Sequence, residues 1–132
     1  MRLVMCCGVF DLFHAGHVAH LRQARSFGDS LVVALTLDEF VQKNGRPIIP
    51  WAERAEILME CKSVDDVIAS RSPVEAIMDF QPNIYVKGHD YKAKGLLPAE
   101  LTACEAVGAQ IRFTDECPPT TTSIIERIKQ CA

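Results

Sequence analysis

The sequence contains no apolar run that approaches the roughly 18 residues needed to span a membrane. Its N-terminus also lacks the succession of basic, apolar and small residues that marks a secretory signal. We therefore expect no membrane partner and a cytoplasmic location.

Positive charge is not in excess either. Lysine and arginine number 14 against 17 aspartate and glutamate residues, so the formal net charge is −3. Nucleic acid is not an expected partner, because its binding depends on a basic surface. With 132 residues, 48% hydrophobic and 23% charged, the chain has the size and composition of one ordinary folded domain, which we expect to cover residues 1–132.

Paired cysteine spacings are missing, although the chain has six cysteines. They stand at scattered positions: Cys6, Cys7, Cys61, Cys104, Cys117 and Cys131. We interpret them as reduced packing residues, with Cys117 as the candidate for a nucleophilic role. The Gly-x-Gly-x-x-Gly fingerprint does not follow the first apolar run, which argues against a dinucleotide-dependent oxidoreductase.

The chain does contain a regular alternation of apolar runs and amphipathic segments. Strands are expected over 2–7, 30–36, 64–69, 83–87 and 110–113. Helices are expected over 18–27, 73–80 and 99–107, from Trp51, around Ile124 and, in a short form, from Glu39. This alternation predicts an α/β fold with a Rossmann-like, doubly wound, five-stranded parallel sheet in the order 3-2-1-4-5.

The link between the first strand and the first helix carries His14 and His17. Three residues are close to one helical turn, so both imidazoles should lie on the same side of the helix start. Backbone amides in a first turn lack partners and favour anions, and Gly16 lets backbone or ligand approach closely. We predict a clamp of two ring N–H donors and free amides around a phosphoryl group. The alternatives are two ordinary surface histidines or a zinc pair extended by His20. Further zinc ligands at tetrahedral spacing are missing, so we expect no metal site.

The residues from Gly8 to His17, Gly-Val-Phe-Asp-Leu-Phe-His-Ala-Gly-His, resemble the signature loop of the cytidylyltransferase-like nucleotidyltransferases. The resemblance implies attack of a substrate phosphate on the α-phosphorus of ATP or CTP, with release of pyrophosphate. Mg²⁺ is expected to accompany the triphosphate, and the resemblance implies a homodimer. His14 and His17 are then the expected catalytic residues, and nucleotide contacts are expected from Gly8, Val9, Phe10, Asp11 and Gly16.

Further cations stand in and after a loop over residues 42–50. Lys43 and Arg46 are either solvated surface charge or groups that close over a triphosphate. The resemblance favours the second interpretation for Lys43, because family members carry a lysine in this loop. The run that begins with Glu53 resembles the family's Glu-Arg-x-x-x-Leu segment, which implies that Arg54 reaches the phosphates or the substrate.

Two polar positions follow strands at the expected ligand-binding edge. Asp38 comes directly after the second strand, where it either contacts a ribose or base or caps a short helix. The segment from Val86 to Tyr91 is similar to the Val-Lys-Gly-Gly-Asp-Tyr stretch of the nucleotidyltransferase domain of bacterial ADP-heptose synthases, with histidine in place of the second glycine. Gly88 and Asp90 are therefore expected to shape the base or substrate pocket.

A row of hydroxyl side chains at 120–123 precedes the last helical run. One hydroxyl should cap the helix, and its first-turn amides would form a second anion site facing the first. The family carries an Ile-Ser-Thr-Thr motif here that binds the nucleotide, with Pro119 and Thr120 replacing Ile and Ser in this chain. Thr120, Thr121 and Thr122 are accordingly expected nucleotide ligands.

The resemblance leaves three functions to weigh. The favoured function is transfer of AMP from ATP to a sugar phosphate of the heptose type. A cytidylyltransferase acting on glycerol 3-phosphate or another alcohol phosphate is the alternative within the same chemistry. A nucleotide-binding regulatory module without catalysis is the alternative from another class.

Overall fold

The computed structural model describes residues 1–42 and 45–131, so Lys43 lies outside the described residues. The strands are β1 (Leu3–Gly8), β2 (Ser30–Thr36), β3 (Asp66–Ser70), β4 (Ile84–Lys87) and β5 (Gln110–Phe113). The helices are α1 (Ala15–Ser26), α2 (Trp51–Met59), α3 (Pro73–Phe80), α4 (Asp90–Lys94), α5 (Pro98–Val107) and α6 (Thr121–Cys131), and η1 (Asp38–Phe40) is a 3₁₀ turn.

The five strands form one parallel sheet in the order β3-β2-β1-β4-β5, which confirms the predicted fold class and strand order. β1 lies at the centre and pairs Leu3 with Ser30 of β2 and Val4 with Ile84 of β4. The chain builds outward from β1 to β3 on one side and then from β4 to β5 on the other. The loops that follow β1 and β4 therefore diverge at a switch point, where doubly wound sheets bind their ligands.

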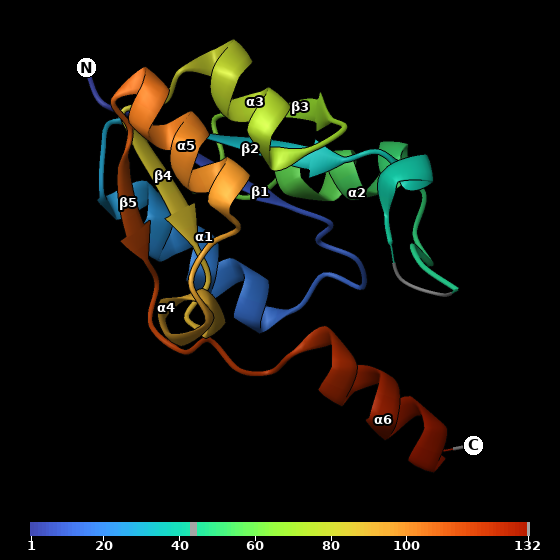
Figure 1. Cartoon of the computed structure of the whole chain (residues 1–132). Coiled ribbons are helices and arrows are strands. Elements are labelled where there is room, and N and C mark those ends of the chain that lie inside the picture. The colour runs from blue at the N-terminus through green and yellow to red at the C-terminus, as the bar shows by residue number, and fades with distance from the viewer. Residues whose placement is uncertain (43–44, 132) are drawn as a thin grey trace.

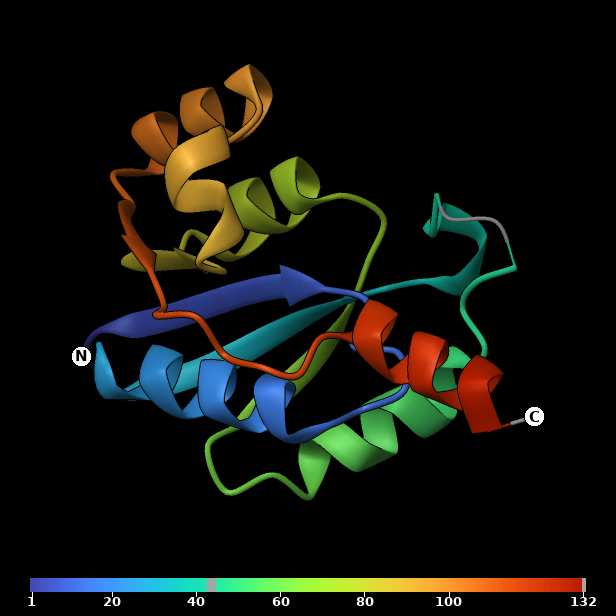
Figure 2. The same cartoon turned by 90° about the horizontal axis from the view of Figure 1, so that it is seen from below.

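Helices cover both faces of the sheet, as Figures 1 and 2 show. Successive residues of a strand point to opposite faces. Val4 packs with Leu21 of α1 and Leu58 of α2, whereas Met5 packs with Ile77 of α3 on the other face. The central strands are apolar on both faces because both are covered, which explains their continuous hydrophobic runs.

Several elements begin at residues other than the predicted ones. β3 begins at Asp66 because Val64 packs in the core before pairing with β2 starts. The expected short helix from Glu39 is the turn η1, and α4 forms after His89 where no helix was predicted. α6 starts at Thr121, ahead of the predicted run, because hydroxyl side chains at its start cap it.

After β5 the chain crosses the carboxyl edge of the sheet and ends in α6. In Figure 1 this helix projects from the rest of the fold, and Figure 2 shows the segment between β5 and α6 passing the start of α1. None of the helices formed by the described residues is long and apolar enough to cross a bilayer.

Candidate functional site

Two adjoining cavities open at the carboxyl edge of the sheet. The first cavity, of about 330 Å³, lies between the start of α1 and the segment 114–121. The second cavity, of about 390 Å³, lies between the loop after β1, Arg46 and the end of β4. The lining residues common to both are Gly8, Val9, Phe10, His17, His20, Gly88 and Thr121. Molecules bound in the two cavities would meet beside His17.

His14 caps helix α1. Its Nδ1 accepts hydrogen bonds from the amides of Gly16 (3.1 Å) and His17 (3.4 Å), and Nδ1 of His17 accepts one from the His14 amide (3.3 Å). A hydroxyl and a carboxylate or carboxamide usually supply the acceptors of such a capping box. The prediction that the amides at this helix start are free is therefore wrong for Gly16 and His17, because the His14 ring accepts a hydrogen bond from each.

The same bonds orient the two imidazoles. The rings stack with centroids 3.7 Å apart and planes at 21°, which confirms that the spacing puts them on one side of the helix start. Each Nδ1 faces an amide N–H, so a neutral ring carries its proton on Nε2. Thr121 Oγ1 donates to the Asp11 carbonyl and lies 3.2 Å from Nε2 of His14, which fits the same tautomer. Nε2–H of His17 is then the donor available at the junction of the cavities.

Burial keeps the histidines of this site neutral. It lowers the pKa of His17 to about 3, with the neighbouring His14 and His20 adding to the effect. It lowers the pKa of His20 to about 4, and it lowers the pKa of His14 as well. The clamp at neutral pH therefore consists of dipolar N–H donors rather than of charged imidazolium rings.

Gly16 lies where the segment after β5 passes over α1. A Cβ at this position would lie 2.3 Å from the carbonyl oxygens of both Cys117 and Pro119. Only glycine permits this approach, which brings Thr120 and Thr121 to the wall of the first cavity. The close approach predicted at Gly16 is thus made by backbone from a distant part of the chain.

The start of α6 forms the opposite wall of the first cavity. Thr120 Oγ1 accepts from the Ser123 amide and Ser123 Oγ from the Thr120 amide, both at 3.0 Å, which confirms the predicted hydroxyl cap. Among the described residues, no hydrogen bond uses the amides of Thr121 or Thr122. These amides are suited to an anion. The Thr122 side chain is exposed and does not line the cavity.

Asp11 fastens the loop after β1 to residues 46–49. Its carboxylate accepts hydrogen bonds from Arg46 Nε and the Ile48 amide at 2.8 Å and from the Ile49 amide at 2.9 Å. Burial by itself would raise the pKa of Asp11, but these hydrogen bonds hold that pKa below its usual value. The carboxylate of Asp11 therefore serves the loop that forms one side of the second cavity.

The backbone of this loop is in an uncommon conformation. Phe10 and Leu12 have positive φ angles of 48° and 51°, which bulky residues rarely adopt and which cluster at functional sites. The Phe10 ring is buried and meets the ring of His17 edge-on, with centroids 5.2 Å apart. Gly8, Val9 and Phe10 thus form the floor that the two cavities share.

Arg54 is a buried brace beneath the site. Its side chain is 1% exposed and donates to the carbonyls of Val9 (2.7 Å) and Ile49 (2.8 Å) and to the Asp38 carboxylate. Neither Arg54 nor Asp38 lines the two cavities. The structure therefore does not bring them to the predicted phosphate, ribose or base contacts, because Arg54 lies on the inward face of α2 and draws Asp38 toward it.

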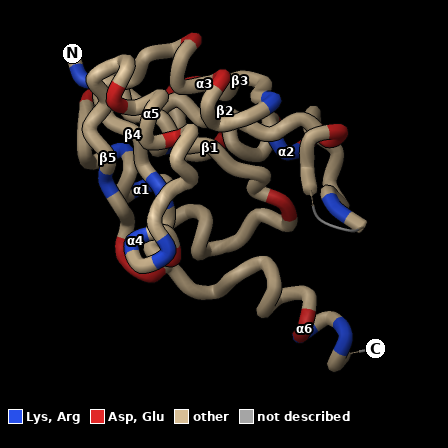
Figure 3. Tube along the Cα trace, viewed as in Figure 1, with Lys and Arg blue, Asp and Glu red and all other residues tan. Residues whose placement is uncertain are grey.

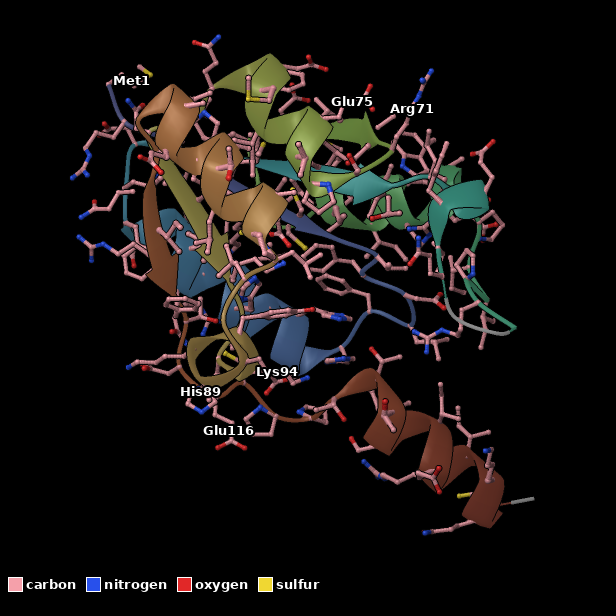
Figure 4. The ribbon with its side chains drawn as sticks, viewed as in Figure 1. Met1, Arg71, Glu75, His89, Lys94 and Glu116 are labelled. Carbon is pink, nitrogen blue, oxygen red and sulfur yellow. The ribbon has the colours of Figure 1, made fainter. Side chains whose placement is uncertain are left out.

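The end of β4 separates the two cavities. Gly88 lines both, whereas His89 and Asp90 line the first. Figure 4 places the labelled His89 and Glu116 at the same end of the molecule, and Glu116 lines the first cavity as well. α4, which begins at Asp90, carries acidic and basic residues close together, as Figure 3 shows.

Lys87, Tyr91 and Thr114 are among the lining residues that were not singled out as site residues from the sequence. Lys87 and Tyr91 line the second cavity, and Thr114, which is buried and lies 2.7 Å from His20 Nδ1, lines the first. Lys87 ends β4 and Thr114 follows β5 directly. Their place at the carboxyl ends of strands was a signal that could have identified both.

Neither a metal cage nor an activated thiol is apparent at the site. The described residues contain no group of three or more His, Cys, Asp or Glu side chains placed to hold a metal ion. Cys117 lies on the wall of the first cavity, and burial raises the pKa of its thiol. A raised pKa disfavours the nucleophilic thiolate, so the structure gives no support to a nucleophilic role for Cys117.

Residues 5–127 match the family model described as cytidylyltransferase-like. The chain belongs to the cytidylyltransferase-like family. It is therefore a nucleotidyltransferase, in agreement with the resemblance of its first loop. The matched range runs from β1 into α6 and includes both cavities.

Relatives share most of this chain. The bifunctional protein HldE of Alkalilimnicola ehrlichii is 39% identical over 97% of this chain and 28% of its own length. HldE of Koribacter versatilis is 44% identical over 75% of this chain and 21% of its own length. A lipopolysaccharide core biosynthesis protein from Thermoplasma volcanium superposes with a TM-score of 0.71 at 30% identity, covering 86% of this chain and 93% of that one. The chain spans about a quarter of the length of these curated HldE relatives.

Proposed function

We propose that this nucleotidyltransferase moves AMP from ATP to a sugar phosphate of the heptose type and releases pyrophosphate. The observation that carries the proposal is the place of His17, whose ring lines both cavities where they meet. A transfer between two substrates requires one binding space on each side of the reacting phosphorus. The two cavities supply these spaces, with a hydrogen-bond donor between them.

The nucleotide is assigned to the first cavity. The open amides at the start of α6 lie along it and suit a triphosphate. Gly88 and Asp90 stand at its other end, where a base or ribose would be placed. The other residues proposed to contact the nucleotide are Gly8, Val9, Phe10, Thr120 and Thr121. Lys43 remains a predicted contact outside the described residues.

The reaction needs little from the protein beyond placement and charge stabilisation. An oxygen of the acceptor phosphate forms a bond to the α-phosphorus while the bond from that phosphorus to the bridging oxygen of pyrophosphate breaks. A phosphate dianion attacks without losing a proton, so no general base is required. The Nε2–H donor of His17 would stabilise the oxygens on which charge increases, joined by that of His14 when a phosphate oxygen replaces Thr121 Oγ1 as its acceptor.

Magnesium would arrive with the triphosphate. Asp11, the acidic residue of the signature loop, is engaged by Arg46 and by two amides, so it offers no vacant carboxylate for an ion. Phosphate oxygens are therefore the expected principal ligands of Mg²⁺. Homodimer formation and a cytoplasmic location remain predictions of the resemblance and of the sequence.

Three observations support a sugar phosphate as the acceptor. The Val86 to Tyr91 segment resembles that of ADP-heptose synthases, and the relatives above that share up to 97% of this chain are proteins named HldE. The relative of similar length from Thermoplasma volcanium is named for lipopolysaccharide core biosynthesis. The resemblance to ADP-heptose synthases and the name of the Thermoplasma volcanium protein both favour a sugar over an alcohol.

Release of pyrophosphate tests the proposal. ATP and CTP, each with Mg²⁺, would be incubated with heptose 1-phosphate, glycerol 3-phosphate and other phosphate esters. Release with ATP and the heptose phosphate alone is the expected result. Release with CTP and an alcohol phosphate would replace the proposed substrates, and nucleotide binding without release across the panel would indicate the regulatory module.

A further inference from the structure

The second cavity contains a lysine held in a defined position. Lys87 ends β4, and its side chain is 10% exposed. Its Nζ lies 3.4 Å from Glu100 Oε2 and 4.1 Å from the centre of the Tyr91 ring. An ammonium group with an anion on one side and an aromatic face on another has a restricted range of positions. The positive charge is thereby kept on the cavity wall.

Glu100 reaches the sheet from α5 and orients this lysine. Its side chain is almost fully buried, and its Oε2 accepts a 2.8 Å hydrogen bond from the buried hydroxyl of Tyr85. A pair of charges removed from water contributes little net stability, because the cost of desolvation offsets the attraction. The main effect of Glu100 is therefore to orient the Lys87 side chain, because the ion pair fixes the position of the ammonium group on the cavity wall.

The ammonium retains donors for a ligand. It carries three N–H bonds, and the described residues make no hydrogen bond with its Nζ beyond the ion pair with Glu100. Arg46 lines the same cavity and uses its Nε for Asp11. The second cavity thus combines two cations with an opening toward His17, which is the chemistry of an anion site. The triphosphate has its own donors at the start of α6, so this anion is a different one.

We propose that Lys87 binds the phosphate of the acceptor and that Glu100 is its positioning residue. This inference rests on the proposed function and adds the place where the acceptor binds, with its phosphate between Lys87 and His17 in the second cavity. An oxygen held there forms the new bond to the α-phosphorus, and the pyrophosphate oxygen leaves with the electron pair of the broken bond. Selection of the acceptor therefore begins with its charge.

Steady-state kinetics of Lys87→Met test the assignment. The variant keeps the length of the side chain and removes its charge, so the KM for the acceptor phosphate should rise about tenfold or more while the nucleotide KM stays within about twofold. Lys92→Met, at an exposed position of α4 outside both cavities, is the matched control and should behave as the parent protein. A rise in the nucleotide KM alone, or no change in either, would overturn the proposal.

A binding measurement separates this inference from the proposed function. Inorganic phosphate would be titrated into the protein saturated with a non-hydrolysable ATP analogue, so that the first cavity is occupied. Binding that Lys87→Met weakens and Lys92→Met does not is the expected result, even if no acceptor in the panel supports turnover. Equal binding by Lys87→Met and the parent protein, or no binding by the parent, would refute the assignment whatever the kinetics show.

Glu100→Gln tests the positioning role. Glutamine still accepts the hydrogen bond from Tyr85 but no longer attracts the ammonium. The acceptor KM should rise, by less than in Lys87→Met, with kcat and the nucleotide KM unchanged. A fall in melting temperature with an unchanged ratio of the two KM values would show that Glu100 only supports the fold.

Discussion

Nδ1 of His14 accepts the amide of His17, and Nδ1 of His17 accepts the amide of His14. This reciprocal pair both caps α1 and fixes the tautomer of each ring, because a nitrogen that accepts an N–H cannot carry a proton. The sequence feature that identifies the site is therefore also the feature that begins the helix. The same two hydrogen bonds therefore begin helix α1 and orient the imidazole donors.

The donor at Nε2 of His17 predicts a difference between two substitutions. The amide nitrogen of glutamine can reach the position of Nε2, whereas that of asparagine reaches only the position of Nδ1. We expect His17→Asn to lower kcat about 10²- to 10³-fold, as loss of a transition-state donor does, and His17→Gln to lower it less. Nucleotide affinity should fall only modestly in both. Equal losses of turnover in the two variants, or losses of affinity that match them, would contradict this role.

The crossing at Gly16 predicts sensitivity to a single methyl group. Gly16→Ala should push the segment at 117–119 away from α1 and lower the free energy of unfolding by about 1–3 kcal/mol. Gly88→Ala is the control at the same site, since a Cβ there meets no atom within 4 Å. Urea unfolding measures both. The explanation fails if the two variants lose the same stability.

The fold was predictable because its signal is repeated. Apolar runs typical of strands alternate with amphipathic runs typical of helices along the whole chain. β1 and β2 are buried on both faces, so their hydrophobic runs are continuous. The order of the strands then followed from the doubly wound architecture that this alternation predicts. Element ends were less predictable, because they depend on single caps such as His14, whose side chain replaces the usual hydroxyl.

The site was predictable only where its residues are local. The spacing of His14 and His17 indicated a shared face, and the hydroxyl row indicated a cap. The bonds of Asp11 to residues 46–49 and of Arg54 to Val9 join segments far apart in the chain. Residue type shows that Arg54 has donors, but only the packing of α2 shows that backbone carbonyls receive them.

The lowered pKa values predict how stability depends on pH. His17 and His20 have folded-state pKa values of about 3 and about 4, against about 6.5 in an unfolded chain. Below about pH 6.5 these histidines bind protons in the unfolded chain but stay neutral in the folded chain. The free energy of unfolding therefore falls as the pH drops from about 6.5 toward 4, by at most about 1.4 kcal/mol per pH unit for each histidine.

Urea unfolding at pH 7, 6 and 5 measures this loss. His20→Asn is the comparison, because it cannot titrate in this range yet can still bond to Thr114, the partner of His20 Nδ1. Its stability should decline less steeply with falling pH than that of the parent protein. Parallel curves would mean that His20 is protonated as readily when folded as when unfolded.

Substitutions of Arg54 distinguish a structural role of its guanidinium from a role as a phosphate ligand. Arg54→Met removes the donors to two buried carbonyls, so the free energy of unfolding should fall by about 2–4 kcal/mol. Arg54→Lys should restore little of it, because one ammonium cannot reproduce a planar fork of donors. Asp38→Asn should cost about 1 kcal/mol or less, since the Asp38 side chain is 48% exposed.

Nucleotide affinity of the folded variants, measured at low temperature, should change much less than stability. A large loss of affinity with unchanged stability would instead place the guanidinium on the phosphates, in another rotamer than the one that joins Val9, Ile49 and Asp38.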